Sequence, residues 1–526
     1  MATLIHEFIF ETARRAPEAV ALICQGVPLH YGALADMVGA AAGAMLAQGL
    51  GRGERVAVYL EKREEAVLAM FGAAAAGAVF VPVNPLLKPA QVGYILRDCG
   101  ARILVTSGQR LEQLGAQLAA CPHLHTVIVV GGGGLPLAGL HSLSWSACMQ
   151  RMLPAPGHRV IESDMAAILY TSGSTGKPKG VVLSHRNMVA GALSVATYLE
   201  NSPQDRILAL LPFSFDYGLS QLTTAFACGA SVVLFNYLFA RDIIDTVEQE
   251  GVTGLAAVPP LWIALSHLSW PRTNRLRYLT NSGGAMQGTT LAALRLALPA
   301  TRVYLMYGLT EAFRSTFLAP DQLDLRPDSI GKAIPNAEVL VLREDGTPCA
   351  AGEPGELVHR GPLVALGYWN DPEKTAARFR PLPPAEDGLP LPELAVWSGD
   401  VVRRDSDGYL YFIGRRDEMI KTSGYRVSPT EVEEVVYASG LVGEAAAVGV
   451  PHPVLGQAIA LLATPLAGQA LDGAALLAAC REALPAFMLP AWVEVRQEAL
   501  PRNPNGKIDR KLLSEQLFEL FSGATR

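Results

Sequence analysis

The sequence lacks the features that mark disulfide-rich, zinc-binding and secreted proteins. Its seven cysteines stand apart, at positions 24, 99, 121, 148, 228, 349 and 480, with no Cys-x-x-Cys pair and no His/Cys cluster at zinc spacing. This pattern predicts buried thiols in a reducing compartment. The first residues, MATLIHEFIFETARR, carry Glu7 and Glu11 where a signal peptide needs an unbroken apolar core, so a cytoplasmic location is expected.

Charge and long apolar runs are also scarce. Only 17% of the residues are charged, and 43 Lys and Arg against 49 Asp and Glu give a net charge of -6. A broad basic surface is therefore absent, and neither nucleic acid nor a membrane is an expected partner. The longest uncharged run, 66–83, is rich in Ala and Gly and ends in Val-Pro-Val, which favours a buried helix and a core strand over a membrane span.

What the sequence does contain indicates a large globular protein. The chain has 526 residues, half of them hydrophobic, with 50 Gly and 36 Pro. This length suits three or four structural units with sizeable cores, and the composition is that of a turn-rich folded protein. Intrinsic disorder and a small metal- or disulfide-stabilised domain are both excluded.

Between residues 55 and 310, short apolar runs rich in β-branched residues alternate with longer helical patterns. RVAVYL, AVFVPV and ARILVT are predicted strands, and the alternation returns in RILALLPF, SVVLF, GLAAVPP, LRYLTNSGG and RVYLMYG. Strands that alternate with helices form βαβ units and a parallel sheet. The predicted fold class is α/β, with a large layered N-terminal domain that contains parallel-rich sheets.

After residue 318 the pattern changes to short strands joined by Asp-Gly turns, as in VLVLREDGTP and DSDGYLYFIGR. Such turns predict hairpins, here in an antiparallel, small β-barrel-like region. Beyond Gly414, SPTEVEEVVYAS is typical of a capped amphipathic helix, with Ser428 as the cap and Glu431 three residues later. The last 110 residues or so are thus expected to form a small α+β domain.

The stretch YTSGSTGKPKG, 170–180, is the most informative in the chain. Its small residues let backbone N–H groups approach phosphate oxygens, while its hydroxyls and two lysines add donors and charge. A Walker A loop is excluded because Lys177 is followed by Pro178, and a Gly/Ser surface loop is the plain alternative. The expected phosphate-binding residues are Thr171, Ser172, Gly173, Ser174, Thr175, Gly176, Lys177 and Lys179.

The stretch TSGSTGKPKG and five further signatures in order resemble the adenylate-forming superfamily of acyl-CoA synthetases, non-ribosomal adenylation domains and luciferases. The further signatures are YGLTE (307–311), GELVHRG with GYWN (ending at 370), SGD (398–400), GRRDEMIKTSGYRV (414–427) and NPNGKIDR (503–510). The resemblance covers essentially the whole chain. More narrowly, VPVNPLLKPAQVGYILRDC, LPFSFDYGL and YGLTEAFRSTFL look like AMP-forming acyl-CoA ligases associated with the exosortase A system.

The resemblance implies roles for residues around ATP. Glu311 would bind Mg²⁺, a hard cation that needs oxygen ligands, and Thr310 would touch the α-phosphate. Tyr307 would lie against the AMP moiety. Asp400 and Arg415 would hold the ribose hydroxyls, which suits a carboxylate acceptor and a planar donor fork. Without the resemblance, Asp400 fits a turn residue and Arg415 a solvated surface charge.

The resemblance also implies a mobile C-terminal lid. Lys507 would reach the active site as a catalytic residue and stabilise charge at the α-phosphate, although Asn-Gly before it also fits a surface turn. Asp417 would lie in a hinge over 415–417, between an N-terminal domain of 1–414 and a lid domain of 418–526. Gly424 would line the tunnel for the pantetheine thiol, where a side chain would obstruct passage.

The segment FSFDYGLS, 213–220, bears on the substrate. Asp216 stands where amino-acid-activating relatives carry the partner of the substrate ammonium, and capping of the following helix is the alternative. Arg314 would meet a second substrate carboxylate or point outward. The implied pocket contains polar and charged residues as well as apolar ones, which argues against a long acyl chain as the substrate. Its residues are Asp216, Tyr217, Ser220, Ala257, Thr280, Ser282, Met306, Phe313 and Arg314.

Together these features predict an ATP- and Mg²⁺-dependent ligase that activates a small amino or polar acid as acyl-AMP and transfers it to a pantetheine thiol. Because the chain ends soon after NPNGKIDRKLL, the thiol is expected in trans, on an acyl or peptidyl carrier protein or on CoA. One alternative is an acyl-CoA synthetase for a carboxylic acid without an amine. The other is a non-catalytic nucleotide-binding relative.

Overall fold

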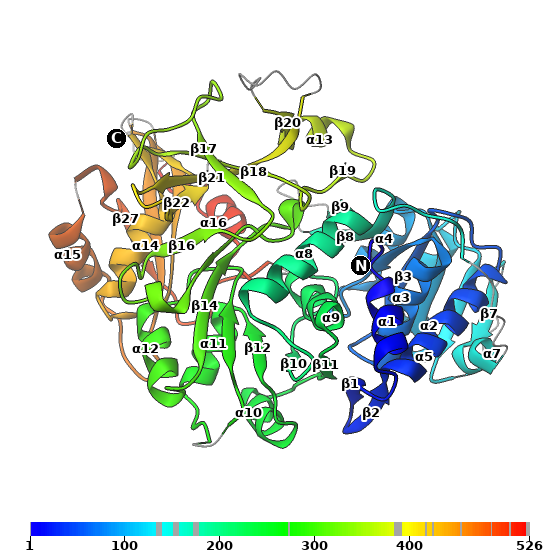
Figure 1. Ribbon diagram of the computed structural model, residues 1–526. Helices are drawn as coiled ribbons and strands as arrows, with labels where there is room; N and C mark the ends of the chain where they lie inside the picture. The colour runs from blue at the N-terminus through cyan, green and yellow to red at the C-terminus, as the bar shows by residue number, and fades with distance from the viewer. Residues whose placement is uncertain are drawn as a thin grey trace. The chain divides into compact units, whose positions relative to one another are not determined.

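In the computed structural model, the alternating apolar runs of the N-terminal half form the strands and helices that their patterns predict (Figure 1). The structure describes residues 2–132, 139–150, 157–171, 178–271, 274–382, 392–415, 418–422, 425–452, 455–484, 486–503 and 506–521. Contacts divide the chain into two units. The first comprises Met1–Val339 and His359–Val396, and the second comprises Leu340–Val358 and Trp397–Arg526. Each unit is described by itself.

One sheet of the first unit follows the order β19-β9-β8-β4-β3-β5-β6-β7. Its strands from β8 to β7 run parallel, and β9 and β19 are antiparallel additions at one edge. In chain order the strands are β3 (Arg55–Tyr59), β4 (Val79–Pro82), β5 (Ala101–Ser107), β6 (Thr126–Val130), β7 (His141–Ser144), β8 (Met165–Thr171), β9 (Lys179–Ser184) and β19 (Gly367–Tyr368).

The other sheet of the first unit follows the order β16-β15-β14-β13-β12-β10-β11-β1-β2. The strands from β14 to β1 are parallel, and β2, β15 and β16 pair antiparallel. They are β1 (Val20–Cys24), β2 (Val27–His30), β10 (Arg206–Ala209), β11 (Ser231–Leu234), β12 (Gly254–Ala257), β13 (Tyr278–Asn281), β14 (Arg302–Tyr307), β15 (Thr316–Leu318) and β16 (Ser329–Ala333).

A layer of helices lies between these two sheets (Figure 1). It consists of α1 (Glu7–Arg15), α2 (Tyr31–Leu46), α3 (Glu64–Ala76), α7 (Trp145–Gln150), α8 (His185–Tyr198) and α9 (Asp216–Cys228). Because successive side chains of a strand point to opposite faces, Val56 and Val58 of β3 pack into this central core. Ala57 and Tyr59 pack into a separate core on the outer face of the same sheet. Burial on both faces explains the near-continuous apolar strands.

The outer faces of both sheets carry further helices. The sheet that contains β3 is covered by α4 (Pro89–Asp98), α5 (Gly108–Leu114) and α6 (Ala116–Ala119), whose apolar residues join its outer core. The other sheet is accompanied by α10 (Ala240–Gln249), α11 (Pro259–Ser266) and α12 (Gly288–Ala297). The short helix α13 (Pro372–Arg378) leads into β20 (Phe379–Pro381). The layered α/β architecture predicted from the sequence is confirmed.

Most residues of four adjacent strands belong to the second unit. In the order β17-β18-β21-β22 they span Glu338–Leu342, Gly355–Arg360, Leu394–Arg404 and Leu410–Arg415, and β21 pairs antiparallel with β22. Because the segments 340–358 and 397–415 pair with one another here, contacts group both with the C-terminal residues. The division by contacts therefore falls earlier along the chain than the predicted boundary at residue 414. The predicted hinge over 415–417 stays a prediction, since residues 416 and 417 lie outside the described ranges.

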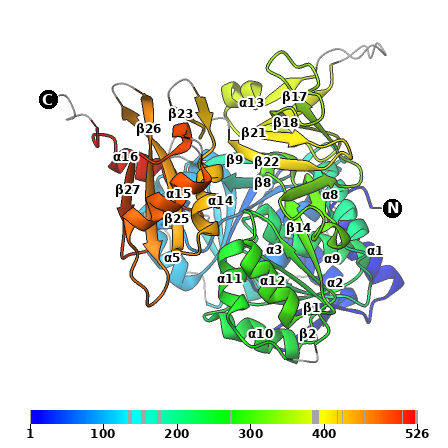
Figure 2. The same ribbon diagram turned by 90° about the vertical axis from the view of Figure 1, so that its left-hand side faces the viewer.

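The rest of the second unit is an α+β sandwich, as predicted (Figure 2). Its sheet has the order β24-β23-β26-β25, with β27 beside β26. The strands are β23 (Ile420–Thr422), β24 (Tyr425–Val427), β25 (Val442–His452), β26 (Gly456–Pro465) and β27 (Trp492–Val495). Helices α14 (Pro429–Ala438) and α15 (Gly473–Ala483) share one apolar cluster with this sheet, and α16 (Arg510–Gln516) shares the other.

One local prediction is wrong. Ser428 precedes α14 as predicted, but its side chain makes no cap hydrogen bond to the helix. Its hydroxyl instead donates to the carbonyl oxygen of Ile413. Pro429 occupies the first helical position, where its missing N–H removes no helix hydrogen bond. The serine hydroxyl therefore connects α14 to β22 rather than closing the helix end.

Two of the expected absences can be compared with the described residues. Within the described ranges, no helix combines the length and the apolar character that crossing a bilayer demands. All seven cysteines lie in those ranges and none of them forms a disulfide; Cys24 and Cys228 are partly exposed, and the others are buried.

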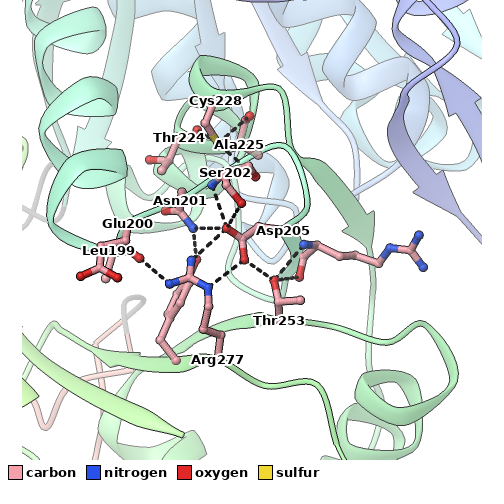
Figure 3. Close-up of polar contacts among 12 residues, drawn as sticks. Leu199, Glu200, Asn201, Ser202, Asp205, Thr224, Ala225, Cys228, Thr253 and Arg277 are labelled. Carbon is pink, nitrogen blue, oxygen red and sulfur yellow. Dashed lines mark hydrogen bonds and ion pairs between the residues drawn. The ribbon is translucent and has the colours of Figure 1, made fainter. Parts of the chain in front are cut away.

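A buried carboxylate connects the parallel strands at the end of α8 (Figure 3). Asp205 is 4% exposed and receives two hydrogen bonds from the Arg277 guanidinium, at 3.1 and 2.9 Å, and one from the Thr253 hydroxyl at 2.7 Å. Asp205 Oδ2 also accepts from the backbone N–H of Ser202. Burial alone raises the pKa of Asp205, but these donors outweigh it and lower the pKa below its usual value.

We expect Asp205→Asn to lower the free energy of unfolding by about 3 kcal/mol, because it leaves the Arg277 cation without its buried counter-charge. Asp324→Asn is the matched control, since Asp324 also receives two hydrogen bonds from one arginine, Arg295, but is exposed. Exposed pairs contribute little, so this variant should unfold like the wild type. Urea unfolding of both variants measures the difference, and equal losses would contradict the role of burial.

Candidate active site

Glu311 is a buried carboxylate at the end of a parallel strand. It follows β14, in a short 3₁₀ turn over Thr310–Ala312. Its Oε1 lies 2.9 Å from Lys179 Nζ, and the Tyr368 hydroxyl donates to the same oxygen at 2.5 Å. Lys179 Nζ also donates to the Tyr368 hydroxyl oxygen, at 2.9 Å. Residues far apart in the sequence therefore meet at one oxygen.

This environment keeps Glu311 ionised. Burial of the carboxyl favours the neutral acid, but the charges of Lys179 and Arg378 and the hydrogen bonds from Tyr368 and Lys179 outweigh burial and lower the pKa of Glu311 to about 2. An anionic, buried oxygen donor is the kind of ligand that Mg²⁺ prefers. Among the described residues, no three His, Cys, Asp or Glu side chains gather into a metal cluster.

The predicted phosphate loop connects two strands that end beside this carboxylate. β8 ends at Thr171, which is paired in register with Lys179 at the start of β9. The loop residues Ser172, Gly173, Ser174, Thr175, Gly176 and Lys177 lie outside the described residues. Thr171 Oγ1 is buried and has no hydrogen-bond partner among the described residues. The loop thus starts at an unsatisfied hydroxyl and ends at the lysine that holds Glu311.

A second buried carboxylate, that of Asp216, is joined to the residue that precedes Glu311. The Thr310 hydroxyl donates to Asp216 Oδ1 at 3.2 Å, and Arg314 Nη1 lies 3.9 Å from Asp216 Oδ2. Helix α9 starts at Asp216, its N-cap residue is Phe215, and no side chain caps it. The capping alternative for Asp216 is therefore not supported. Arg314 is 2% exposed, so it does not point outward.

The predicted pocket residues are all buried and come from α9, from neighbouring parallel strands and, for Phe313 and Arg314, from the turn that follows Thr310–Ala312. The Tyr217 hydroxyl and Thr280 Oγ1 lie 2.6 Å apart, which joins the helix to β13. The Ser220 hydroxyl contacts Thr224 Oγ1 within α9 instead, at 3.4 Å. Met306 Sδ accepts from the Tyr198 hydroxyl. The buried set is Asp216, Tyr217, Ser220, Ala257, Thr280, Ser282, Met306, Phe313 and Arg314.

The predicted ribose residues belong to the second unit. Asp400 of β21 and Arg415 of β22 are paired in register across the antiparallel strands. Arg415 Nη1 lies 3.5 Å from Asp400 Oδ1. A carboxylate acceptor and a guanidinium donor therefore stand side by side, as binding of two hydroxyls requires. Their role toward ribose stays a prediction.

The other predicted residues of the C-terminal part are also on the second unit. Lys507 is exposed, on a tight turn in which Gly506 has φ +78° and the Lys507 N–H donates to Asn503 Oδ1. Residues 504 and 505 lie outside the described ranges, and the Gly506 N–H donates to the Asn503 carbonyl at 2.9 Å. Asp417 and Gly424 lie outside the described residues. The catalytic, hinge and tunnel roles of Lys507, Asp417 and Gly424 stay predictions.

Three further residues belong to the Glu311 region although sequence reasoning gave them no role. They are Tyr368, Arg378 and His359. His359 is buried, and burial together with the charge of Arg378 lowers its pKa to about 3, so it is neutral at physiological pH. The Tyr307 ring stacks on it, with centroids 6.3 Å apart. The signatures GELVHRG and GYWN contain His359 and Tyr368, but no local pattern shows that they meet Glu311.

Family models match most of the chain. The model described as AMP-binding enzyme matches residues 9–369, and the model described as AMP-binding enzyme C-terminal domain matches residues 431–507. The two matched segments contain the phosphate loop, Glu311 and the pocket residues in the first case and Lys507 in the second.

Known proteins resemble the chain over nearly its full length. It is 30% identical to L-proline--[L-prolyl-carrier protein] ligase of Pseudomonas fluorescens, over 98% of this chain and 99% of that protein. It is 30% identical to tyrocidine synthase 3 of Brevibacillus parabrevis over 99% of this chain, but it spans only 8% of that much longer protein. The crystal structure of ATP-bound MatB from Rhodopseudomonas palustris matches with a TM-score of 0.87 at 27% identity, over 99% of this chain and 100% of that one.

We expect Glu311→Gln to lower the free energy of unfolding by about 3 kcal/mol at neutral pH, because Lys179 loses its buried counter-charge. The folded-state pKa of Glu311, about 2, lies below the ordinary 4.5, so its stabilisation is complete above about pH 4.5 and is lost as the pH falls toward 2. The cost of the substitution should therefore be constant from about pH 8 to pH 5 and shrink below that. Urea unfolding across this pH range measures it.

Glu433→Gln is a control for which we expect the opposite pH dependence. Burial raises the pKa of Glu433 above 4.5 although Arg510 contacts it at 2.6 Å. The folded protein then keeps a proton that the unfolded chain has lost, so the advantage of glutamate over glutamine decreases as the pH rises through that window. If the loss of unfolding free energy caused by Glu311→Gln decreased with rising pH, as expected for Glu433→Gln, the ionised state of Glu311 would be disproved.

Proposed function

The chain belongs to the AMP-binding enzyme family of adenylate-forming ligases, and from this premise we propose that it activates a carboxylic acid in two steps. In the first, a carboxylate oxygen attacks the α-phosphorus of ATP, the bond to the bridging oxygen breaks, and pyrophosphate leaves. In the second, a pantetheine thiolate attacks the acyl carbon and AMP leaves with that oxygen. The observation that carries this proposal is the buried, ionised Glu311 held by Lys179 at the end of the phosphate loop.

The residues of the first unit fit Mg²⁺ and the phosphates of ATP. Glu311 offers an anionic oxygen, and Mg²⁺ bound there would neutralise phosphate charge as pyrophosphate departs. The loop from Thr171 to Lys179 holds the phosphates through its N–H and hydroxyl donors. Lys179, fixed between Glu311 and Tyr368, keeps the loop end in place. The Thr310 hydroxyl, which donates to Asp216 in the structure, contacts the α-phosphate.

The second unit supplies the remaining groups of this proposal. Asp400 and Arg415, opposite one another on β21 and β22, bind the ribose hydroxyls as acceptor and donor. Lys507 brings its ammonium to the α-phosphate and the attacking carboxylate. Rotation about a hinge at Asp417 then exchanges the adenylation state for the thiol-transfer state, in which Gly424 lines the pantetheine tunnel.

We propose a small amino or polar acid as the substrate and a carrier-protein pantetheine as the acceptor, in the cytoplasm. The substrate ammonium pairs with Asp216, a buried carboxylate whose predicted neighbours around the substrate include Tyr217 and Thr280, which are also buried. The relative that loads proline on a carrier protein supports this choice, since the two chains match from end to end. CoA is the competing acceptor.

The test of function is ATP–pyrophosphate exchange with pooled amino acids and, separately, pooled fatty and aryl acids. Exchange in the amino-acid pool is expected. Asp216→Asn should reduce exchange more with substrates that carry an amine than with substrates that lack one, because the amide cannot neutralise an ammonium. Equal selectivity of Asp216→Asn and wild type between an amine substrate and its desamino analogue would contradict the ammonium role. Transfer of the activated acid to CoA but to no carrier protein would overturn the carrier assignment.

We expect Lys507→Ala to reduce pyrophosphate exchange on the order of 100-fold or more, since it removes charge stabilisation at the α-phosphate. Thiol transfer from a synthetic acyl-AMP should remain close to wild type, because the adenylate is already formed. Lys511→Ala, another exposed lysine nearby in the chain, is the matched control and should leave both steps unchanged. Comparable loss of both steps in Lys507→Ala would refute the assigned role.

A further inference from the structure

Arg314 is a buried cation whose side chain finds no hydrogen-bond acceptor among the described residues. Its side chain is 2% exposed, and its guanidinium donates no hydrogen bond to any described residue. Its Nε is fully enclosed and unpartnered among those residues. A guanidinium has five N–H donors in a rigid fork, and leaving them unsatisfied inside a protein costs free energy. Proteins keep such groups where a ligand completes them, so Arg314 indicates a binding site for an acceptor.

The neighbours of Arg314 compensate its charge without satisfying its donors. Asp216 Oδ2 is 3.9 Å from Arg314 Nη1, which is close enough for charge attraction but too long for a hydrogen bond. The guanidinium lies over the Tyr217 ring, 4.5 Å from its centroid. Asp216 takes its hydrogen bond from Thr310 instead. The charges of Asp216 and Arg314 therefore balance. Both side chains still have hydrogen-bonding groups that a ligand could use.

A strained turn holds Arg314 in this place. Phe313 has φ +56° and ψ -58°, and the Arg314 N–H donates to the Ala312 carbonyl at 2.6 Å, which together describe a γ-turn of the rare, strained type. The Phe313 ring packs so closely on Gly191 of α8 that an added Cβ there would lie 2.3 Å from it. Strain of this kind persists where the surroundings enforce it, and it collects at binding sites.

The charge of the pair selects among substrate classes. An acyl group that carries only an ammonium would leave the buried site with one positive charge in excess, and a dicarboxylic acid would leave one negative charge. A neutral acyl group also keeps the site balanced but leaves the guanidinium donors without an acceptor. An acyl group that carries both an ammonium and a second carboxylate leaves no buried charge unpaired, which is the condition under which buried ions are tolerated. It also gives the guanidinium fork a planar, two-oxygen acceptor.

We propose that Arg314 is a specificity-determining residue that binds the side-chain carboxylate of an amino dicarboxylic acid whose ammonium pairs with Asp216. This inference rests on the proposed adenylation function and names its substrate class. The reacting carboxylate remains free to attack ATP. Tyr217 and Thr280, joined by their own hydrogen bond, border the site, and the buried lining is expected to exclude long side chains.

The experiment is ATP–pyrophosphate exchange with the full chain and matched single acids. L-aspartate and L-glutamate carry both groups, L-asparagine and L-glutamine lack the charge, L-alanine lacks the acceptor, and succinate and glutarate lack the amine. We expect kcat/KM for an acidic amino acid to exceed that for its amide by about 100-fold or more, since a site built for a hydrogen-bonding group rejects the analogue that lacks it.

Variants separate recognition from folding. Arg314→Gln should lower kcat/KM for the acidic amino acid about 100-fold, chiefly through KM, and should reverse the preference between acid and amide. Arg314→Lys keeps the charge but not the fork, so it should retain part of the preference. Arg302→Gln, on β14, removes an arginine whose partner Glu200 is exposed, and it should behave as wild type. ATP binding by each variant verifies that the site is folded.

The outcomes distinguish the inference from the function on which it rests. If neutral amino acids are activated as well as acidic ones and Arg314→Gln changes neither, the inference is overturned and adenylation stands. If only succinate or glutarate is activated, the amino half of the inference is overturned. If no carboxylic acid supports exchange, the proposed function fails and the inference fails with it.

Discussion

The ion pair between Lys179 and Glu311 is the interaction on which the rest of the site depends. Lys179 begins β9, in one sheet of the first unit, and Glu311 follows β14, in the other. Tyr368, from β19, hydrogen-bonds to both. The pair thus fixes the two sheets to one another at the site and, in the same contact, keeps a buried carboxylate ionised. The carboxylate proposed to bind Mg²⁺ and the end of the predicted phosphate loop are therefore positioned by one structural requirement.

The pKa values of two buried carboxyl groups near the same turn, those of Glu311 and Asp216, are shifted in opposite directions. Glu311 faces a lysine and a tyrosine hydroxyl, and its pKa is lowered to about 2. The pKa of Asp216 is raised, because burial outweighs the charge of Arg314 and the hydrogen bond from Thr310. Environments that separate two acids in this way assign them different tasks. Under the proposed function, the permanently ionised acid binds ATP-Mg, and Asp216 with its neighbouring arginine binds the substrate.

Local pattern predicted much of this molecule, because strands buried on both faces must be apolar and phosphate loops must be small and rich in donors. The layered sheets and the helix after Ser428 followed from such patterns, whereas the roles predicted for Glu311 and Asp216 came from the family resemblance. The contacts of Tyr368 and His359 did not, since they join residues far apart in the chain. Nor did the placement of Arg314, because a γ-turn at Phe313, a residue with a side chain, has no sequence signal. Ser428 showed the same limit, with a hydroxyl directed to Ile413 rather than to its helix.

The measurement that tests the central claim most directly follows the oxygen of the substrate. With an activated acid labelled with ¹⁸O in its carboxyl group, attack on the α-phosphorus and later thiolysis leave one labelled oxygen in AMP. We predict AMP that is heavier by one ¹⁸O and unlabelled pyrophosphate, measured by mass spectrometry. Label in inorganic phosphate, with ADP as the other product, would instead mean that the acid attacks the terminal phosphorus and would contradict adenylate formation.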